Sequence, residues 1–242
     1  FLAFYLNYKN HPLKIDRHLL RSIRHDPSLS KLIFKLGIPT GVQMVTTSLA
    51  GLVIIGLVNR YGAHATAAYG AVNQVLNYIQ FPAMSISIAA SIFAAQAIGA
   101  GKSDLSAKVT RTALGMNILF TGTLITLAYL FSKYLMALFI TDHSVVVLGQ
   151  QLLFIVLWSI LFFGASAIFA SIMRASGTVN VPMMINILTI LLIEVPCAYW
   201  FSSMWGLNGI WTAYALAFVC LCIFQASYYQ FVWKRRDIKR LI

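Results

Sequence analysis

Charged residues are scarce in this sequence, and acidic residues are the scarcest. Only 10% of its 242 residues are charged, with six Asp and Glu against 18 Lys and Arg. A soluble globular protein carries about 25% charged residues, whereas this chain is 60% hydrophobic with a mean hydropathy of +0.79. This composition excludes an ordinary soluble domain and predicts an integral membrane protein.

The sequence also lacks the motifs that mark enzymes and metal sites. It contains no H-E-x-x-H, no G-x-S-x-G, no P-loop and no pair of acids within one apolar segment. Its three cysteines, Cys197, Cys220 and Cys222, lie in apolar stretches without C-x-x-C spacing. The net charge of +12 does not indicate a nucleic-acid partner, because the basic residues flank apolar segments instead of forming a basic domain. We therefore expect neither an enzyme nor a bound cofactor.

Uncharged windows divide most of the chain into six segments that can cross a bilayer, which takes about 20 apolar residues. They are Leu36–Val58, Ala65–Gly99, Thr112–Ser132, Ser144–Met173, Val181–Met204 and Ile210–Trp233. Pro82 is expected to kink the long second segment. The predicted fold is an all-α integral membrane bundle of six transmembrane helices.

Basic residues flank these segments unevenly. Six crossings put residues 9–35, 100–111, 174–180 and 234–242 on one side, and all but two of the 18 Lys and Arg residues fall there. The positive-inside rule makes that side cytoplasmic. We expect a multi-pass protein of the plasma (inner) membrane with both ends of the bundle in the cytoplasm, residues 234–242 forming a basic tail.

We make two predictions for the residues before the first segment. Residues 1–8 are apolar but too short to cross a bilayer, so we expect them to end a preceding transmembrane helix. Residues 9–35 form a basic cytoplasmic linker whose apolar residues at helical spacing predict an amphipathic surface helix. A solvated linker is the alternative. Asp26 followed by Pro27 is typical of a helix start.

Glu194 is the one acid that lies deep in an apolar stretch. It is the only charged residue in the 59 positions between Arg174 and Lys234. An ionised carboxylate in hydrocarbon costs at least about 2.5 kcal/mol, so such residues usually face a bundle interior or a wet cavity. Pro196 has no N–H, which deprives the Leu192 carbonyl of its helical partner and favours a kink. Glu194 is a candidate proton or cation site, and a protonated Glu194 bonded to a neighbouring helix is the alternative.

The second segment carries six residues spaced three or four apart, five of them polar, and this spacing places them on one helix face. They are Asn73, Asn77, Gln80, Met84, Ser87 and Ser91. Unpaired amides are costly in lipid. This face therefore either lines a water-filled cavity or hydrogen-bonds to other helices, at about 0.6 kcal/mol per contact.

Aromatic residues gather near the ends of the last two segments. They are Trp200, Trp205 and Trp211 on the outer side and Tyr228, Tyr229 and Trp233 on the inner side. Because such rings favour the headgroup region, we expect membrane-interface anchors instead of a ligand site.

Five short motifs in order resemble those of multidrug and toxic compound extrusion (MATE) transporters. They are Gly37-Ile-Pro39, Gln96-Ala-Ile-Gly-Ala-Gly101 followed by Ala107, Leu138-Phe-Ile-Thr-Asp142, Met173-Arg-Ala-Ser-Gly177 with Pro182, and Gly206-Leu-Asn-Gly-Ile-Trp211. The resemblance covers residues 36–233. It implies the C-terminal six-helix lobe of a twelve-helix transporter, with an N-terminal lobe as its partner.

The resemblance also implies a function: efflux of organic, cationic drugs or toxic compounds by antiport against H⁺ or Na⁺, through alternating access. Glu194 is then the expected coupling residue, with Asn73, Asn77 and Gln80 lining the cavity. One branch of the family has acids in the first and fourth helices of this lobe. The matching positions fall near Thr47 and near Phe163-Gly164, so that branch's sodium site is not implied here.

Two rivals remain. One is a flippase for lipid-linked oligosaccharides of the same superfamily. Such proteins place several basic residues in their cavities, and no Lys or Arg of this chain falls clearly within a predicted segment. The other is a membrane protein without transport activity.

Overall fold

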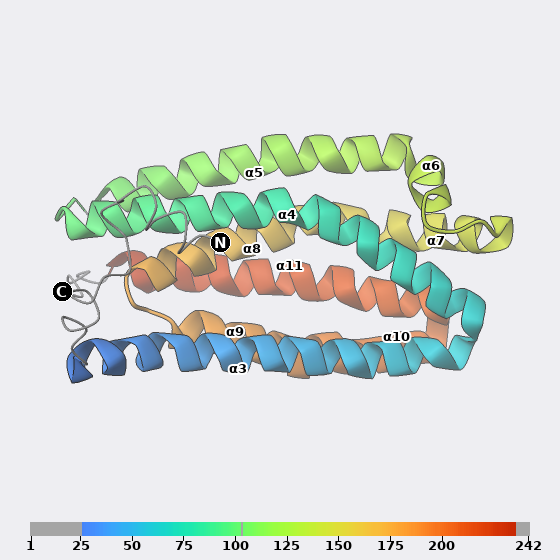
Figure 1. Cartoon of the computed structure of the whole chain (residues 1–242), viewed down its shortest axis with the longest axis horizontal. Coiled ribbons are helices and arrows are strands. Elements are labelled where there is room, and N and C mark those ends of the chain that lie inside the picture. The colour runs from blue at the N-terminus through green and yellow to red at the C-terminus, as the bar shows by residue number, and fades with distance from the viewer. Residues whose placement is uncertain (1–25, 103, 236–242) are drawn as a thin grey trace, which may run out of the picture. The chain divides into compact units, whose positions relative to one another are not determined.

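The computed structural model describes residues 26–102 and 104–235 (Figure 1). Over these two ranges every regular element is a helix. The expected helix end at residues 1–8, the linker up to residue 25 and the tail from residue 236 lie outside them. The chain divides into two compact units, Phe1–Ile38 and Pro39–Ile242.

Six helical stretches of the described chain are long and apolar enough to cross a membrane. They are Ile33–Tyr61, Ala63–Gly99, Leu105–Leu130, His143–Ala175, Asn180–Trp205 and Leu207–Arg235. Each overlaps one of the six expected segments. The predicted all-α fold with six membrane-spanning helices is therefore confirmed.

Several of these stretches combine more than one helix. The first three contain α3 (Pro27–Val58), α4 (Ala63–Gly99) and α5 (Asp104–Leu130), and the short α6 (Ser132–Ala137) follows. The fourth joins α7 (His143–Val156) to α8 (Ile160–Ala175). The fifth joins α9 (Asn180–Thr189) to α10 (Val195–Trp205), and the sixth contains α11 (Leu207–Phe231). A helix begins at Pro27 as predicted, but the short separate helix expected there is instead the start of α3, which continues through Pro39 to Val58.

The second unit packs around two buried apolar clusters. α4 packs against α5 and α8, and α11 packs against α8 and α10. The larger cluster includes Val72, Leu153 and Ile210, and the smaller one includes Ala94 and Ile172. The ribbon of α4 bends along its length (Figure 1), and Pro82 is the residue inside it that lacks a backbone N–H.

The expected kink beside Pro196 takes the form of a π-helical turn. This turn, Ile190–Glu194, joins α9 to α10, and the Val195 N–H bonds to the Ile190 carbonyl five residues back. Single π turns inside α-helices frequently occur at functional sites. Glu194 is the last residue of this turn.

Gly101 ends α4 and explains one of the five motifs. Its φ of 74° suits glycine because it has no Cβ. The Lys102 N–H bonds to the Ala97 carbonyl at 2.9 Å, and the Gly101 N–H bonds to the Ile98 carbonyl at 3.0 Å. These two bonds form a Schellman cap, which satisfies carbonyls that the helix end would leave unpaired.

Asp142, the last residue of another motif, caps the start of α7. Its Oδ1 accepts hydrogen bonds from the Ser144 hydroxyl at 2.7 Å and from the Ser144 N–H at 2.8 Å. Hydrogen bonds from Ser144 favour the carboxylate, so the pKa of Asp142 lies below its ordinary value. The motif thus has a structural role here, as an N-cap.

Candidate functional site

A cavity of about 460 Å³ lies within the second unit. Its wall is built from α3, α4, α8, α9, α11 and the π turn, together with Val156 at the end of α7. All four residues singled out in the sequence line it: Glu194, Asn73, Asn77 and Gln80. Helices distant in sequence thus bring the lone acid and the three amides to one space.

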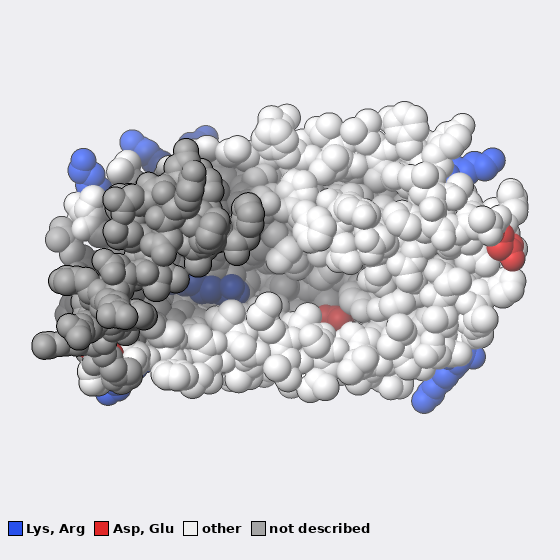
Figure 2. Space-filling view, in the orientation of Figure 1, with Lys and Arg blue, Asp and Glu red and all other residues white. Residues whose placement is uncertain are grey.

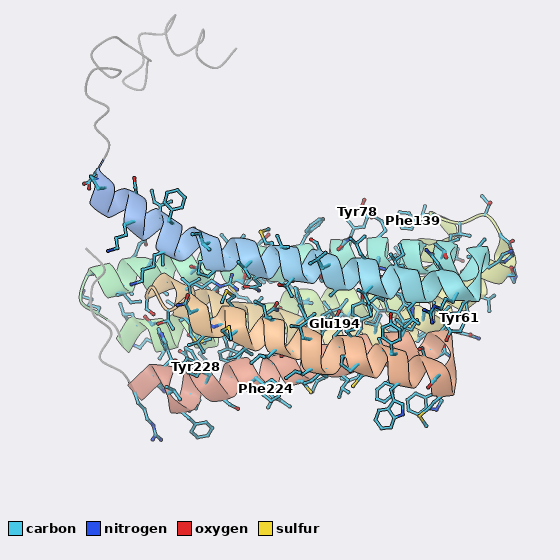
Figure 3. The ribbon with its side chains drawn as sticks, turned by 90° about the horizontal axis from the view of Figure 1, so that it is seen from below. Tyr61, Tyr78, Phe139, Glu194, Phe224 and Tyr228 are labelled. Atoms are coloured by element: carbon cyan, nitrogen blue, oxygen red, sulfur yellow. The ribbon has the colours of Figure 1, made fainter. Side chains whose placement is uncertain are left out.

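Glu194 enters this cavity from the π turn. Figure 3 shows it about midway between Tyr61 at one end of the bundle and Tyr228 toward the other. The carboxyl is largely buried, and the described residues offer it no hydrogen bond or ion pair. It lies near Tyr214, whose hydroxyl is 3.1 Å from that of Tyr69. The alternative of a carboxyl bonded to a neighbouring helix finds no such bond in the described chain.

The three amides enter from α4. Asn73 donates from Nδ2 to the Tyr69 carbonyl at 3.0 Å, a bond that stays within its own helix. Over residues 26–102 and 104–235, none of the three bonds to another helix. This arrangement supports cavity lining over helix-to-helix bonding.

Aromatic side chains form much of the remaining wall. Trp211 is fully buried, and its ring centroid lies 5.3 Å from that of Tyr69. The expectation that Trp211 is a membrane-interface anchor is therefore wrong. Gly206 and Gly209 explain its position, because Gly206 turns the chain at a φ of 58° and Gly209 lets α11 contact the Phe201 carbonyl of α10.

Two other expected anchors are also buried. Trp233 stacks on Tyr229 with ring centroids 5.1 Å apart, and its Nε1 donates to the Ser176 hydroxyl at 2.9 Å. Both side chains belong to the smaller apolar cluster. Trp200 and Trp205, by contrast, are exposed, as an interface anchor must be.

A second cavity, of about 420 Å³, adjoins the first. The two share four wall residues, Met84, Phe163, Asn186 and Leu221. Ser87 and Ser91, which continue the polar face of α4, line this second cavity. In the space-filling view, Lys and Arg gather at the two ends, and acidic and basic atoms are also visible in the hollowed middle (Figure 2).

Arg174 lines the second cavity, which corrects the expectation that no basic residue enters the bundle. It lies in the last turn of α8, within the membrane-spanning stretch. Gly177, at a φ of 81°, closes the same type of cap that ends α4, with the Thr178 N–H bonded to the Met173 carbonyl at 3.1 Å. Because helical side chains point back toward the helix N-terminus, Arg174 reaches into the bundle from its last turn.

Two buried amides near Arg174 were not predicted. Gln225 in α11 is 2% exposed and donates from Nε2 to the Pro182 carbonyl at 3.1 Å. Its Oε1 and the Oδ1 of Asn186 are buried without a partner in the described chain. The available signal was an amide inside a long uncharged window, where an unpaired amide is costly in lipid.

A metal site is not formed by the described residues, in which no group of three His, Cys, Asp or Glu side chains comes together. The described cysteines are free thiols at Cys197, Cys220 and Cys222. What the two cavities offer is one carboxyl, one guanidinium, several amides and aromatic rings. This set suits the binding of small molecules.

Comparison with known proteins decides the family. Residues 39–200 match the MatE family. The chain belongs to the MatE family. It is 43% identical to the probable multidrug resistance protein YoeA of Bacillus subtilis (strain 168) over 243 residues, which cover all of this chain and 52% of that protein. It is 30% identical to the probable multidrug resistance protein YpnP of the same strain, over 85% of this chain and 46% of that one.

Solved structures agree on the fold. An outward-facing multidrug resistance MATE family transporter matches with a TM-score of 0.78 at 21% identity, over 88% of this chain and 47% of that chain. The bent form of the Vibrio cholerae MATE transporter VcmN matches with a TM-score of 0.76 at 20% identity, over 87% and 50%. The MatE chain thus has the fold of one lobe and spans about half the length of the curated relatives it matches.

Proposed function

We propose that this chain is the C-terminal lobe of a secondary active transporter that exports organic, cationic compounds in exchange for H⁺ or Na⁺. The observation that carries the proposal is the convergence of Glu194 and the amides of α4 on one cavity. The names of the relatives YoeA and YpnP, both probable multidrug resistance proteins, support efflux as the direction of transport.

Glu194 supplies the charge for cation binding. Its carboxyl is the one acidic group lining either cavity in the described chain. A carboxylate within the bundle is costly unless a proton or a cation balances it, so H⁺, Na⁺ and an organic cation compete for the same group. An organic cation favours the bare carboxylate, so the proton or Na⁺ leaves as the compound binds. This exclusion is what exchange requires.

Aromatic walls suit the same ligands. Tyr69 and Trp211 pack together beside the cavity, and Phe163 packs on Phe218 with ring centroids 5.2 Å apart. The face of an aromatic ring attracts a cation by about 0.5–2 kcal/mol, the larger values being for desolvated sites. The amides can hydrogen-bond to varied polar groups. The cavity can therefore bind flat aromatic cations of different shapes.

Transport follows from two conformations. Two lobes that rock about a site near the bilayer midplane expose it to each side in turn. A bound ion shifts the equilibrium between these two conformations only if it binds one of them more tightly. Glu194 is the last residue of the π turn, so a change in that turn would move the carboxyl and redirect α10 together.

Export driven by an ion gradient tests the proposal. The full-length protein is placed in vesicles, and uptake or export of a permanently charged aromatic dye is followed under a pH or Na⁺ gradient. Glu194→Gln keeps the size and hydrogen bonding of the side chain but cannot bind a proton or Na⁺ as a carboxylate does. We expect it to insert normally and to lose gradient-driven export, whereas Asp142→Asn at the exposed cap retains it. Near-normal export by Glu194→Gln overturns the coupling role.

The flippase alternative gains one observation from the structure. Arg174 supplies a basic group in a cavity, as recognition of a lipid-linked pyrophosphate requires. No other Lys or Arg of the described chain lines either of the two adjoining cavities. One cation beside one acid supports small-molecule export more than pyrophosphate transfer, and a lipid-flipping assay on the same vesicles separates the two.

A further inference from the structure

The guanidinium of Arg174 is a partly buried charge without a counter-ion in the described chain. Its Nη2 donates to the neutral Gln43 Oε1 at 3.3 Å, and its Nε is buried with no partner. Arginine stays protonated in proteins, so the charge cannot be removed by losing a proton. A buried charge is costly unless it is paired and hydrogen-bonded. An anion bound in the second cavity would therefore stabilise the guanidinium of Arg174.

Two neighbouring amides have oxygen atoms that lack a hydrogen-bond donor. The Nε2 of Gln225 faces the Pro182 carbonyl, which can only accept, and this fixes the orientation of the amide. Its Oε1 is then the acceptor left without a donor, in a side chain 2% exposed. The Oδ1 of Asn186 is also without a partner. The cavity thus offers a cation and amide acceptors together.

Four serines line the second cavity, and three of their hydroxyls donate within their own helices, the exception being Ser91. Ser87 donates to the Met84 carbonyl at 2.8 Å, and Ser166 donates to the Phe163 carbonyl at 2.7 Å. Ser171 likewise donates to the carbonyl of the residue three positions before it, at 2.9 Å. The protons of these three hydroxyls are committed to their own helices, and Arg174 is the one cationic side chain of the described chain that lines the cavity.

We propose that the second cavity is a binding subsite for an oxyanion, a carboxylate or phosphate group of a small molecule or a lipid, held by Arg174. The oxygens of such a group accept from Nε and the free guanidinium N–H groups. A protonated oxygen or an adjacent N–H of the ligand donates to Gln225 Oε1. This subsite is independent of the role of Glu194, which lines only the first cavity.

Thermal unfolding of the purified full-length protein tests the subsite. The unfolding midpoint is titrated with inorganic phosphate against chloride at equal ionic strength, because a ligand that binds only the native state raises the midpoint. We expect phosphate to stabilise the wild type. Arg174→Gln should weaken the apparent affinity at least about tenfold, as loss of a charge-assisted hydrogen bond does. Arg60→Gln, at an exposed position, and Glu194→Gln should bind phosphate as the wild type does.

A second arm distinguishes a lipid from a free anion. The same proteins are placed in bilayer discs of phosphatidylglycerol or phosphatidylcholine, and the phospholipid retained after detergent extraction is measured by mass spectrometry. Selective retention of phosphatidylglycerol that Arg174→Gln abolishes assigns the anion to a lipid headgroup. Phosphate binding without such retention assigns it to a soluble ligand.

The proposal is overturned if Arg174→Gln matches the wild type in both arms, because another carboxylate of the protein then neutralises the guanidinium. If Arg174→Gln does not fold, Arg174→Lys is compared with Arg60→Lys. Lysine keeps the charge but lacks Nε and the planar fork. Weaker phosphate affinity in Arg174→Lys alone supports the subsite, and equal affinity in the two variants refutes it.

Discussion

Gly209→Ala is expected to destabilise the bundle at the contact that positions Trp211. A Cβ at Gly209 would overlap the Phe201 carbonyl and lie 2.8 Å from the Ser202 backbone nitrogen. These are backbone atoms, so no side chain can rotate away and α10 must shift from α11. Overpacking of this kind costs about 1–3 kcal/mol. For a protein of this size that lowers the unfolding midpoint by about 2–12 °C.

Gly115→Ala is the matched control. Gly115 also lies in a long helix, but a Cβ there meets nothing within 4 Å. Alanine in an open helical position stabilises by about 0.4–1 kcal/mol. Thermal unfolding of the full-length protein, followed by loss of monodisperse protein on heating, compares the two variants. Equal midpoints for Gly209→Ala and Gly115→Ala would refute the close contact of α10 and α11.

Three further predictions follow from the cavity, the cap and the length of the chain. In full-length protein without native cysteines, Asn77→Cys should react with a hydrophilic thiol reagent. Leu119→Cys, on the exposed face of α5, is the control and should not react. Protection of both cysteines would contradict a water-filled cavity. The lowered pKa of Asp142 means that its cap stabilises α7 above its ordinary pKa of 3.8, and that this contribution is lost as the pH falls through the lower folded value. The unfolding midpoint of the wild type should therefore fall more steeply below about pH 4 than that of Asp142→Asn, and parallel curves contradict the cap. Finally, the 242-residue chain expressed alone should insert in the membrane but restore no drug resistance; restored resistance, with no dimer found by cross-linking, contradicts a path between two lobes.

The number and limits of the spanning helices could be predicted from the sequence because charge is excluded from hydrocarbon. The windows without charge end at Arg60, Lys102 and Lys133, close to the observed helix ends. The start of α3 at Pro27 was also predictable, because proline suits the first turn of a helix. These features depend on local sequence and on the bilayer.

Features that depend on packing could not be predicted in the same way. Trp211 and Trp200 have similar neighbours in sequence, but one is fully buried and the other is 64% exposed. Arg174 was assigned to a loop because it ends an uncharged window, yet its direction along α8 carries it into a cavity. The shared cavity of Glu194 and Asn77 joins the π turn to α4, a contact that neither segment indicates alone. Glu194 and Asn77 could nevertheless be selected as candidates from the sequence, because each is costly in lipid.

Glu194 is the residue on which the proposed function depends. Its carboxyl lies about midway along the bundle (Figure 3) and has no protein partner in the described chain. A group that is costly to bury and unpaired is available to a ligand. The ligand it selects should then carry the opposite charge.

The most direct measurement of this claim is equilibrium binding of two dyes to the purified full-length protein. One dye is a permanently charged aromatic cation, and the other is an uncharged aromatic molecule of similar size. The account predicts that Glu194→Gln weakens binding of the cation at least about tenfold, the effect of losing one favourable charge interaction. It predicts no comparable loss for the uncharged dye. Equal affinity of the wild type and Glu194→Gln for the cation would contradict it.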